Sequence, residues 1–349
     1  MFESAGLDHT IDKVTYKREE PLLREAREKT GYKRHLSLDP RMRADEATKS
    51  ILRSLLRTIK MNEAGTLRDL DPEFLHDFRV AVRRTRTCLA QIKGVFPQKP
   101  VDHFRREFSW LGRVSGPKRD LDVYLLNMDE YETHLHKKVR HHLAPLRQFL
   151  QTRQRIEQDR LAKALQSARY RTLMRSWKRF LEEAVPEKTR LPNARRPILH
   201  MASERIERRF RRALKDGRKT EPASPAKALH RLRIECKKLR YLLEFFRSLY
   251  EPEDLEPLVK ALKGLQNTLG NFNDLQMQQV VMKKFGQQMV KEGMATDELL
   301  KAIRWVVTWL KARQAKERKR FDKRFTNFSH RKNQKRLKRL LETQNRTAV

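Results

Sequence analysis

The chain has 349 residues, and its 80 lysines and arginines outnumber its 44 aspartates and glutamates, which gives a formal net charge of +36. It has only two cysteines and 11 glycines, a composition that excludes a disulfide-stapled domain and favours helices. Self-repulsion of this size is unfavourable unless an anion is usually bound, so nucleic acid, polyphosphate and an acidic membrane surface are the candidate partners.

The first half of the sequence predicts an all-α fold. Residues 1–40 are polar and of mixed charge, and we expect them to form an arm outside the helical core. Helices are then predicted after Pro40, over 71–96, over 101–112 and from Asp120 onward. Pro145 is expected to kink or break the last of these.

The second half follows the same order. The predicted helices are 197–215, 225–250, 254–269, one from Asn273, and a last, strongly basic one from about 296. The three prolines within 186–197 mark the best boundary between helical units. We therefore predict a first unit at 41–185, a linker at 186–196, and a second unit with the basic C-terminal helix at 197–349. The basic run is expected to be solvated and to add non-specific affinity for polyanions.

Neither cysteine nor hydropathy points to an extracellular or membrane protein. Cys88 and Cys236 lie in apolar helical stretches, and we interpret them as buried, reduced thiols. No apolar run has the length of a signal peptide or of a membrane-spanning helix. A cytoplasmic location is predicted.

An internal repeat is the most informative feature of the sequence. The segment 76–86 (HDFRVAVRRTR) matches the segment 230–240 (HRLRIECKKLR) at an offset of 154 residues. The same offset connects Gly116 with Gly270, so the register continues through a helix, a turn, a second helix and another turn. We predict two copies of one helical unit.

On a helical wheel, each copy separates its cations from its apolar residues. The first stripe is His76, Arg79, Arg83 and Arg86, the second stripe is His230, Arg233, Lys237 and Arg240, and Arg84 and Lys238 flank them. Neither stripe contains an acid, and the first one along either stripe is Glu244. Ion pairs between residues four apart in these helices are therefore expected to be largely absent. A solvated face is the plain alternative, but it would not need a histidine and three cations at identical spacings twice. We therefore predict that the stripes bind a ligand.

The residue types in the stripes favour bare phosphates over nucleic acid. Readers of single strands interleave aromatic residues for stacking, but here only Tyr241 adjoins a stripe. Asn and Gln, which read base edges in duplexes, are missing from both stripes. A row of cations suits phosphate oxygens, so inorganic polyphosphate is the predicted ligand. A nucleic-acid-binding or ribosome-associated protein is the alternative.

The doubled H-x-x-R-[VI]-x-x-[RK]-[RK]-x-R helix, followed each time by a G-x-x-x-D-L turn, resembles the CHAD family (conserved histidine α-helical domain) over about residues 40–340. The resemblance implies two four-helix bundles related by pseudo-two-fold symmetry, with basic helices around a central cavity. It also implies binding of polyphosphate and association with polyphosphate granules, with other granule proteins as further partners. The implied ligand-binding residues are His76, Arg79, Arg83, Arg84, Arg86, His230, Arg233, Lys237, Lys238 and Arg240, and the first-helix cations Arg53, Arg57, Arg208 and Arg212 are added without a motif match.

The two turns of the repeat differ. The first reads GPKRDLD at 116–122 and the second reads GNFNDLQ at 270–276, so the second copy loses the arginine and the second acid. The role of those two positions is therefore in doubt in the second half. We interpret Asp120 and Asp274 as N-caps after a glycine turn, with pairing to arginine as the alternative.

Catalysis is not expected, and no metal or cofactor is predicted. Histidine catalysis usually needs a positioned acid or metal, and neither stripe offers one. The histidines between His134 and His142 lack the i,i+4 pair of helical zinc sites. Relatives of the CHAD domain occur fused to a triphosphatase module with an E-x-E-x-K signature, which this chain lacks. A polyphosphatase is therefore the least favoured interpretation.

Overall fold

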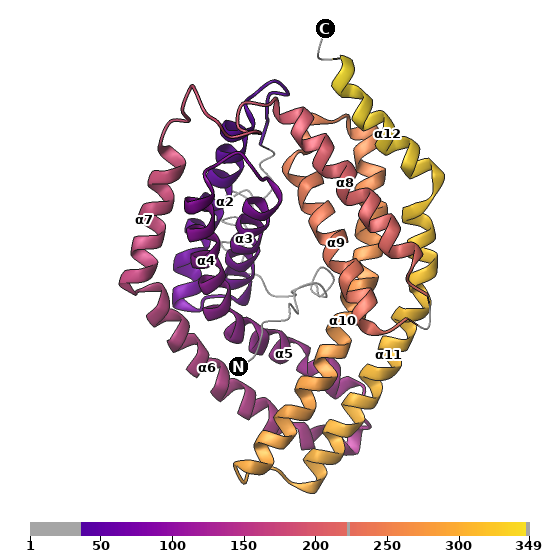
Figure 1. Ribbon diagram of the computed structural model, residues 1–349. Coiled ribbons are helices and arrows are strands. Elements are labelled where there is room, and N and C mark those ends of the chain that lie inside the picture. Colours follow the sequence, from indigo (N-terminus) through magenta and orange to yellow (C-terminus); the bar gives the residue numbers. More distant parts are fainter. Residues whose placement is uncertain (1–35, 222–223, 347–349) are drawn as a thin grey trace.

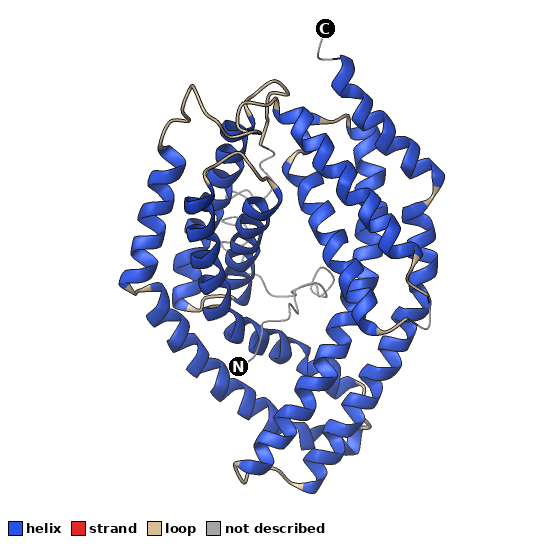
Figure 2. Ribbon diagram, viewed as in Figure 1, coloured by secondary structure: helices blue, strands red, loops and turns tan. Residues whose placement is uncertain are grey.

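The computed structural model describes residues 36–221 and 224–346. These residues form helices and no strand, and an isolated bridge joins Arg43 to Pro197 (Figure 2). The prediction of an all-α fold is therefore confirmed. The predicted arm at 1–40 lies outside the described residues except for 36–40.

The helices of the two halves are as follows. The first half contains α2 (Ala44–Arg68), α3 (Pro72–Gln91), α4 (Gln98–Val114), α5 (Gly116–Thr133), η2 (Lys137–Leu143), α6 (Ala144–Leu165) and α7 (Ala168–Glu182). The second half contains α8 (Ile198–Arg218), α9 (Ala226–Phe245), η3 (Arg247–Leu249), α10 (Pro252–Lys291), α11 (Asp297–Ser329) and α12 (Arg331–Arg346).

The two halves lie side by side and are tied together at one end. Figure 1 shows α2, α3, α4 and α7 on one side and α8 to α12 on the other, while α5 and α6 cross towards the far ends of α10 and α11. At that crossing, Tyr124 of α5 and Phe149 of α6 contact Phe285 of α10 edge-on, with ring centroids 5.2 and 6.1 Å apart. Apolar residues of both halves are buried together in this cluster and in the larger core.

Local sequence explains how α3 begins and ends. The side chain of Asp71 accepts a hydrogen bond from the amide of Glu73 at 2.6 Å, and Pro72 occupies the first turn, as predicted. The helix ends at Gln91 rather than at 96. Gly94 adopts φ = 76°, a left-handed conformation that glycine tolerates, and this turns the chain before Pro97.

The prediction of separate helices at 254–269 and from Asn273 was wrong, because α10 is continuous through this region. In the first half, only Ser115 separates α4 from α5, and Pro117 occupies the first turn of α5. Proline lacks an amide hydrogen and clashes with the preceding turn, which favours a break in the helix at this point. The repeat position holds Asn271, and Gly270 alone does not stop the helix.

The segment between α7 and α8 is non-helical, as expected for 186–196, but it is firmly attached to α2. The amides of Ala44 and Asp45 donate to the carbonyls of Arg196 and Ala194, at 2.9 and 3.1 Å. The first amides of a helix have no partner inside it, so this segment provides acceptors for the start of α2. Whether it also separates two domains stays a prediction.

Three further expectations concern the rest of the chain. The single basic helix predicted from about 296 is interrupted at His330, which separates α11 from α12. Cys88 and Cys236 are buried, unpaired thiols, as predicted. None of the helices in the described ranges is long and apolar enough to cross a membrane.

Candidate functional site

The two stripes lie on α3 and α9, the repeat-related helices that contact one another between the halves. The apolar sides are buried as the wheel predicted: Phe78, Val82 and Leu89 on α3, and Leu232 and Leu239 on α9. Figure 1 shows α3 and α9 facing each other from the inner sides of the two groups of helices. The fold therefore brings together two segments that are 154 residues apart.

Direct bonds join the two helices. Arg83 Nε donates to the hydroxyl of Tyr241 at 2.9 Å, and Arg84 pairs with Glu244 at 3.3 Å. The guanidinium of Arg84 also lies 5.2 Å from the ring centroid of Phe245. The cations of α3 are thus held against α9, at a helix pair that carries the matched histidine motif twice.

Four cations of this region act on one another electrostatically. Burial is the largest cause that lowers the pKa of Arg233, and the charge of Arg83 adds to it, while Asp274 opposes both. Burial and the charges of Arg233 and Arg83 hold the pKa of Lys237 well below its usual value, and Arg240 adds to this. Lys237 forms no hydrogen bond or ion pair with any residue of the described ranges. Asp274 acts in the opposite direction on Lys237 as well.

Two members of the stripes are held by buried partners on neighbouring helices. Arg79 Nη1 donates to the carbonyl of Gly112 and to Ser115 Oγ, both at 2.9 Å, at the C-terminal end of α4. A cation there is favourable because helix C-termini present unpaired carbonyls. Arg233, which is 4% exposed, pairs with the buried Asp274 at 3.3 Å.

This arrangement also corrects the interpretation of Asp120 and Asp274 as N-caps. Asp274 lies inside the continuous α10, and Asp120 lies in the second turn of α5, whose flanking residue is Ser115. The alternative of pairing to arginine is right for Asp274. Burial raises the pKa of Asp120 to about 6, and the positive charge of Arg79 acts against this rise.

Each motif histidine is bound through Nδ1 to the residue at position 119 or at its repeat equivalent, position 273. His76 Nδ1 lies 3.1 Å from Arg119 Nη2, and His230 Nδ1 lies 2.8 Å from Asn273 Oδ1. Both partners are buried. The position that the sequence left in doubt therefore contacts the histidine in both halves.

The remaining stripe and flanking cations differ in their exposure and in whether an acid pairs with them. Arg240 pairs with Glu244 at 3.3 Å, and Lys238 pairs with Glu235 at 2.7 Å. Arg86 is exposed, and its guanidinium lies close to Gly112. A Cβ atom built onto Gly112 would be only 3.2 Å from Nη1 of Arg86. Two acids outside the stripes, both on α9 itself, thus neutralise part of the site.

The four cations added from the first helices are not bonded to the stripes. Arg53 Nε donates to the carbonyl of Leu181 at the end of α7, and Arg212 pairs with Asp216 on its own helix. Arg57 and Arg208 are exposed. No hydrogen bond or ion pair connects any of the four to a stripe within the described ranges.

Sequence reasoning missed Arg209, which lies on α8 next to the chosen Arg208. Its Nε donates to Gln91 of α3 at 2.8 Å, and its Nη1 donates to Glu235 of α9 at 2.9 Å. Arg209 therefore connects α8 to both α3 and α9. Its partner Glu235 also pairs with the flanking Lys238. The signal was its place directly before the buried Phe210, at the border of the apolar side of α8.

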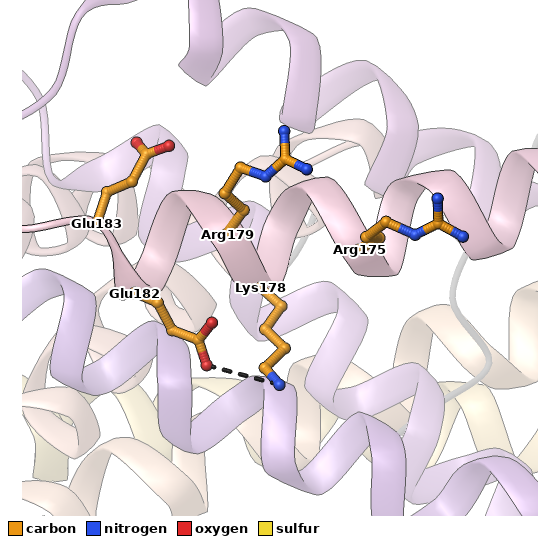
Figure 3. A pocket seen from close by; sticks show the side chains of 5 residues that line it. All are labelled: Arg175, Lys178, Arg179, Glu182 and Glu183. Carbon is orange, nitrogen blue, oxygen red and sulfur yellow. Dashed lines mark ion pairs between the residues drawn. The ribbon is translucent and has the colours of Figure 1, made fainter.

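A surface hollow and possible metal ligands were the other candidate sites outside the stripes. A surface hollow on α7 is lined by Arg175, Lys178, Arg179, Glu182 and Glu183, with Lys178 paired to Glu182 at 3.7 Å (Figure 3). Its two carboxylates make it less suited to a polyanion than the stripes. In residues 36–221 and 224–346, no three His, Cys, Asp or Glu side chains are grouped to hold a metal ion.

Comparisons with known proteins agree with this architecture. A family model described as the CHAD domain matches residues 50–283. The crystal structure of the CHAD domain from the plant Ricinus communis has a TM-score of 0.70 and 27% identity, covering 85% of this chain and 95% of that one. PptA from Streptomyces chartreusis has a TM-score of 0.59 at 13% identity, covering 82% and 100%, a likeness of fold alone. No match was found among curated proteins.

Proposed function

The chain belongs to the CHAD family, which is associated with polyphosphate binding, and from this premise we propose that it binds inorganic polyphosphate through the stripes of α3 and α9. One observation carries the proposal: Arg83 of the first stripe lies close enough to the second for its charge to lower the pKa of both Arg233 and Lys237. Cations that repel one another at this helix pair favour an anion that contacts several of them at once.

A chain of phosphates meets this requirement. Each phosphate brings negative charge and oxygen acceptors, which arginine binds bidentately and lysine binds as a point charge. Lys237, which has no bonded partner in the described ranges, and the exposed Arg86 are the stripe cations best placed to gain contacts. Residues that already have buried partners, such as Arg79 and Arg233, contribute positive potential and fix the geometry.

Nucleic acid is the second candidate, and the aromatic residues at the stripes argue against it. Base stacking needs an exposed ring face beside the cations. Tyr241 is 3% exposed and its hydroxyl accepts from Arg83, while Phe245 is 5% exposed beneath Arg84. Non-specific contacts with nucleic acid remain compatible with the net charge of +36.

We propose binding without catalysis, in the cytoplasm and at polyphosphate granules. Two acids close to the stripes are engaged by arginines, Asp274 by Arg233 and Glu244 by Arg84 and Arg240. Such carboxylates are poorly placed to act as general bases. Incubation with polyphosphate and Mg²⁺, Mn²⁺ or Zn²⁺ should therefore release no orthophosphate above buffer, and a fluorescent fusion should form foci only in cells that contain polyphosphate.

The decisive experiment is a titration with long-chain polyphosphate at increasing salt, together with competition by RNA. Binding should weaken steeply with salt, because each neutralised phosphate releases counterions. Excess polyphosphate should displace RNA, whereas RNA should displace polyphosphate poorly. If RNA displaces polyphosphate as readily, the nucleic-acid function takes its place.

A matched pair of variants connects the titration to the stripes. Arg86→Glu should weaken binding by about tenfold or more, since a charged hydrogen bond is worth roughly 1.5–3 kcal/mol. Lys335→Glu, at an exposed position on α12 outside both stripes, changes the net charge equally. Its effect should stay within about twofold once salt screens long-range charge. Equal losses in the two variants would assign the binding to net charge alone.

A further inference from the structure

The two motif histidines have different hydrogen-bond partners, and chemistry fixes which of their nitrogens carries the proton. His76 Nδ1 lies 3.1 Å from Nη2 of Arg119. A guanidinium only donates, so Nδ1 of His76 must accept and is unprotonated. In the neutral ring, the proton is therefore on Nε2.

The opposite holds for His230. Its Nδ1 lies 2.8 Å from Oδ1 of Asn273, and the Nδ2 of this asparagine donates to Asp274 Oδ1 at 3.3 Å. The carboxylate only accepts, so it fixes the orientation of the amide and directs Oδ1 to the histidine. Nδ1 of His230 must then donate, and in the neutral ring Nε2 carries no proton.

Both partners are held in place by further contacts. Arg119 is 2% exposed, donates to the carbonyl of Pro72 at 3.1 Å and lies 3.7 Å from Glu73. Asn273 is 8% exposed inside the continuous α10. They occupy the same position of the repeat, at an offset of 154 residues. A single difference between the copies therefore reverses the tautomer.

We infer that Arg119 and Asn273 are positioning residues that set His76 and His230 in opposite tautomers, so that the two halves present different groups to a phosphate chain. His76 offers an Nε2–H donor as a neutral ring, whereas the neutral His230 offers a bare Nε2. Phosphate oxygens accept hydrogen bonds, so the Nε2–H of His76 suits a phosphate oxygen, whereas the bare Nε2 of a neutral His230 does not. The ligand part of this inference depends on the proposed function, but the tautomers do not.

The tautomers are measured without ligand, by long-range ¹H–¹⁵N correlation NMR at about pH 8, where an ordinary histidine is neutral. The signals are assigned by their loss in His76→Gln and His230→Gln. The expected result is an Nε2–H ring for residue 76 and an Nδ1–H ring for residue 230. If both rings have the same tautomer, the inference is wrong whether or not the protein binds polyphosphate.

A variant of the positioning residue tests the cause. Asn273→Leu removes the acceptor of Nδ1–H, so His230 should change to the Nε2–H form that free histidine prefers, while His76 stays as it is. The unchanged His76 signal shows that the fold is intact. A His230 ring that keeps its Nδ1–H tautomer in this variant would show that Asn273 does not position it.

Binding tests the consequence. His76→Leu should weaken polyphosphate binding by about tenfold, and His76→Gln, which restores a donor near the position of Nε2, should recover most of the loss. His230→Leu should cost less, about threefold. Equal losses for the two leucine variants would overturn the assignment of the phosphate contact to His76, and the NMR result would stand separately.

Discussion

Arg83 of the first stripe donates from Nε to the hydroxyl of Tyr241, 158 residues later in the chain, over 2.9 Å. Burial raises the pKa of Tyr241, but the charges of Arg83 and Arg240 outweigh it, and the pKa lies below its usual value. The hydroxyl is a buried acceptor between two cations. This hydrogen bond connects the first stripe to α9 of the second half.

Tyr241→Phe should therefore loosen the contact between the halves while leaving the ring contacts with Arg84 and Arg240 in place. Loss of a hydrogen bond to a charged group should lower the free energy of unfolding by about 1.5–3 kcal/mol, measured by urea denaturation. The control is Tyr250→Phe, whose hydroxyl bonds Ser203 Oγ at 2.9 Å and does not contact a stripe cation in the described ranges. Both variants lose a buried hydroxyl, but only Tyr241→Phe should also weaken polyphosphate binding.

The next prediction concerns the buried pair of Arg233 and Asp274 and its contribution to the free energy of unfolding. Asp274 is fully buried, so Arg233→Met leaves a carboxylate without its arginine and should cost about 3–5 kcal/mol. The double variant with Asp274→Leu removes both charges and should recover most of that loss. Urea denaturation of the two single variants and the double variant gives the coupling. Additive losses would show that the pair contributes no buried ionic interaction.

The periodicity of the sequence was sufficient to predict the helices that carry the site. The apolar sides of α3 and α9 and the start of α3 at Asp71-Pro72 depend on residues within one helix, so the wheel and the capping rule locate them. The continuity of α10 was missed because Gly270 was interpreted as a turn by analogy with Gly116. The break in the first copy depends on Pro117, which the second copy lacks.

The contacts of the stripes could not be predicted from the wheel. The wheel places no acid within the first stripe itself, but Arg84 pairs with Glu244 of the other half and Arg233 pairs with Asp274 of α10. These partners depend on how helices pack, not on spacing within one helix. The same limit applies to Arg53 and Arg212, whose bonds lie outside the stripes.

The lowered pKa of Lys237 leads us to expect that binding depends on pH. Burial, Arg233 and Arg83 lower the pKa of its amine, Arg240 on α9 acts in the same direction, and Asp274 on α10 opposes them. A bound phosphate chain would raise that pKa again, so binding takes up a proton between the lowered pKa and the usual value near 10.4. Affinity should therefore fall as the pH rises through this window.

Calorimetry at about pH 8 in two buffers of different ionisation enthalpy measures this uptake. Wild type should show different heats in the two buffers, and Lys237→Arg, which stays charged, should show nearly the same heat in both. Identical heats for wild type would mean that Lys237 is already protonated before the ligand arrives.

The last prediction concerns whether one ligand spans both stripes. Arg86→Gln removes one charge from the first stripe and Lys237→Gln removes one from the second, and neither side chain has a bonded partner in the described ranges to be left behind. Lys335→Gln on α12 is the control with the same loss of charge. Circular dichroism checks that all three variants keep their helices.

A long chain that occupies both stripes gains affinity because its second contact is intramolecular, by factors of about 10² or more when the geometry allows both. Loss of either stripe cation should therefore weaken long-chain binding by about tenfold, whereas a short chain can occupy the intact stripe and should lose only about twofold. The measurement is a titration of each protein with long and short polyphosphate. If either stripe variant binds long chains as tightly as wild type, the stripes do not share a ligand. Binding would then depend on one half, or on the basic surface of α11 and α12.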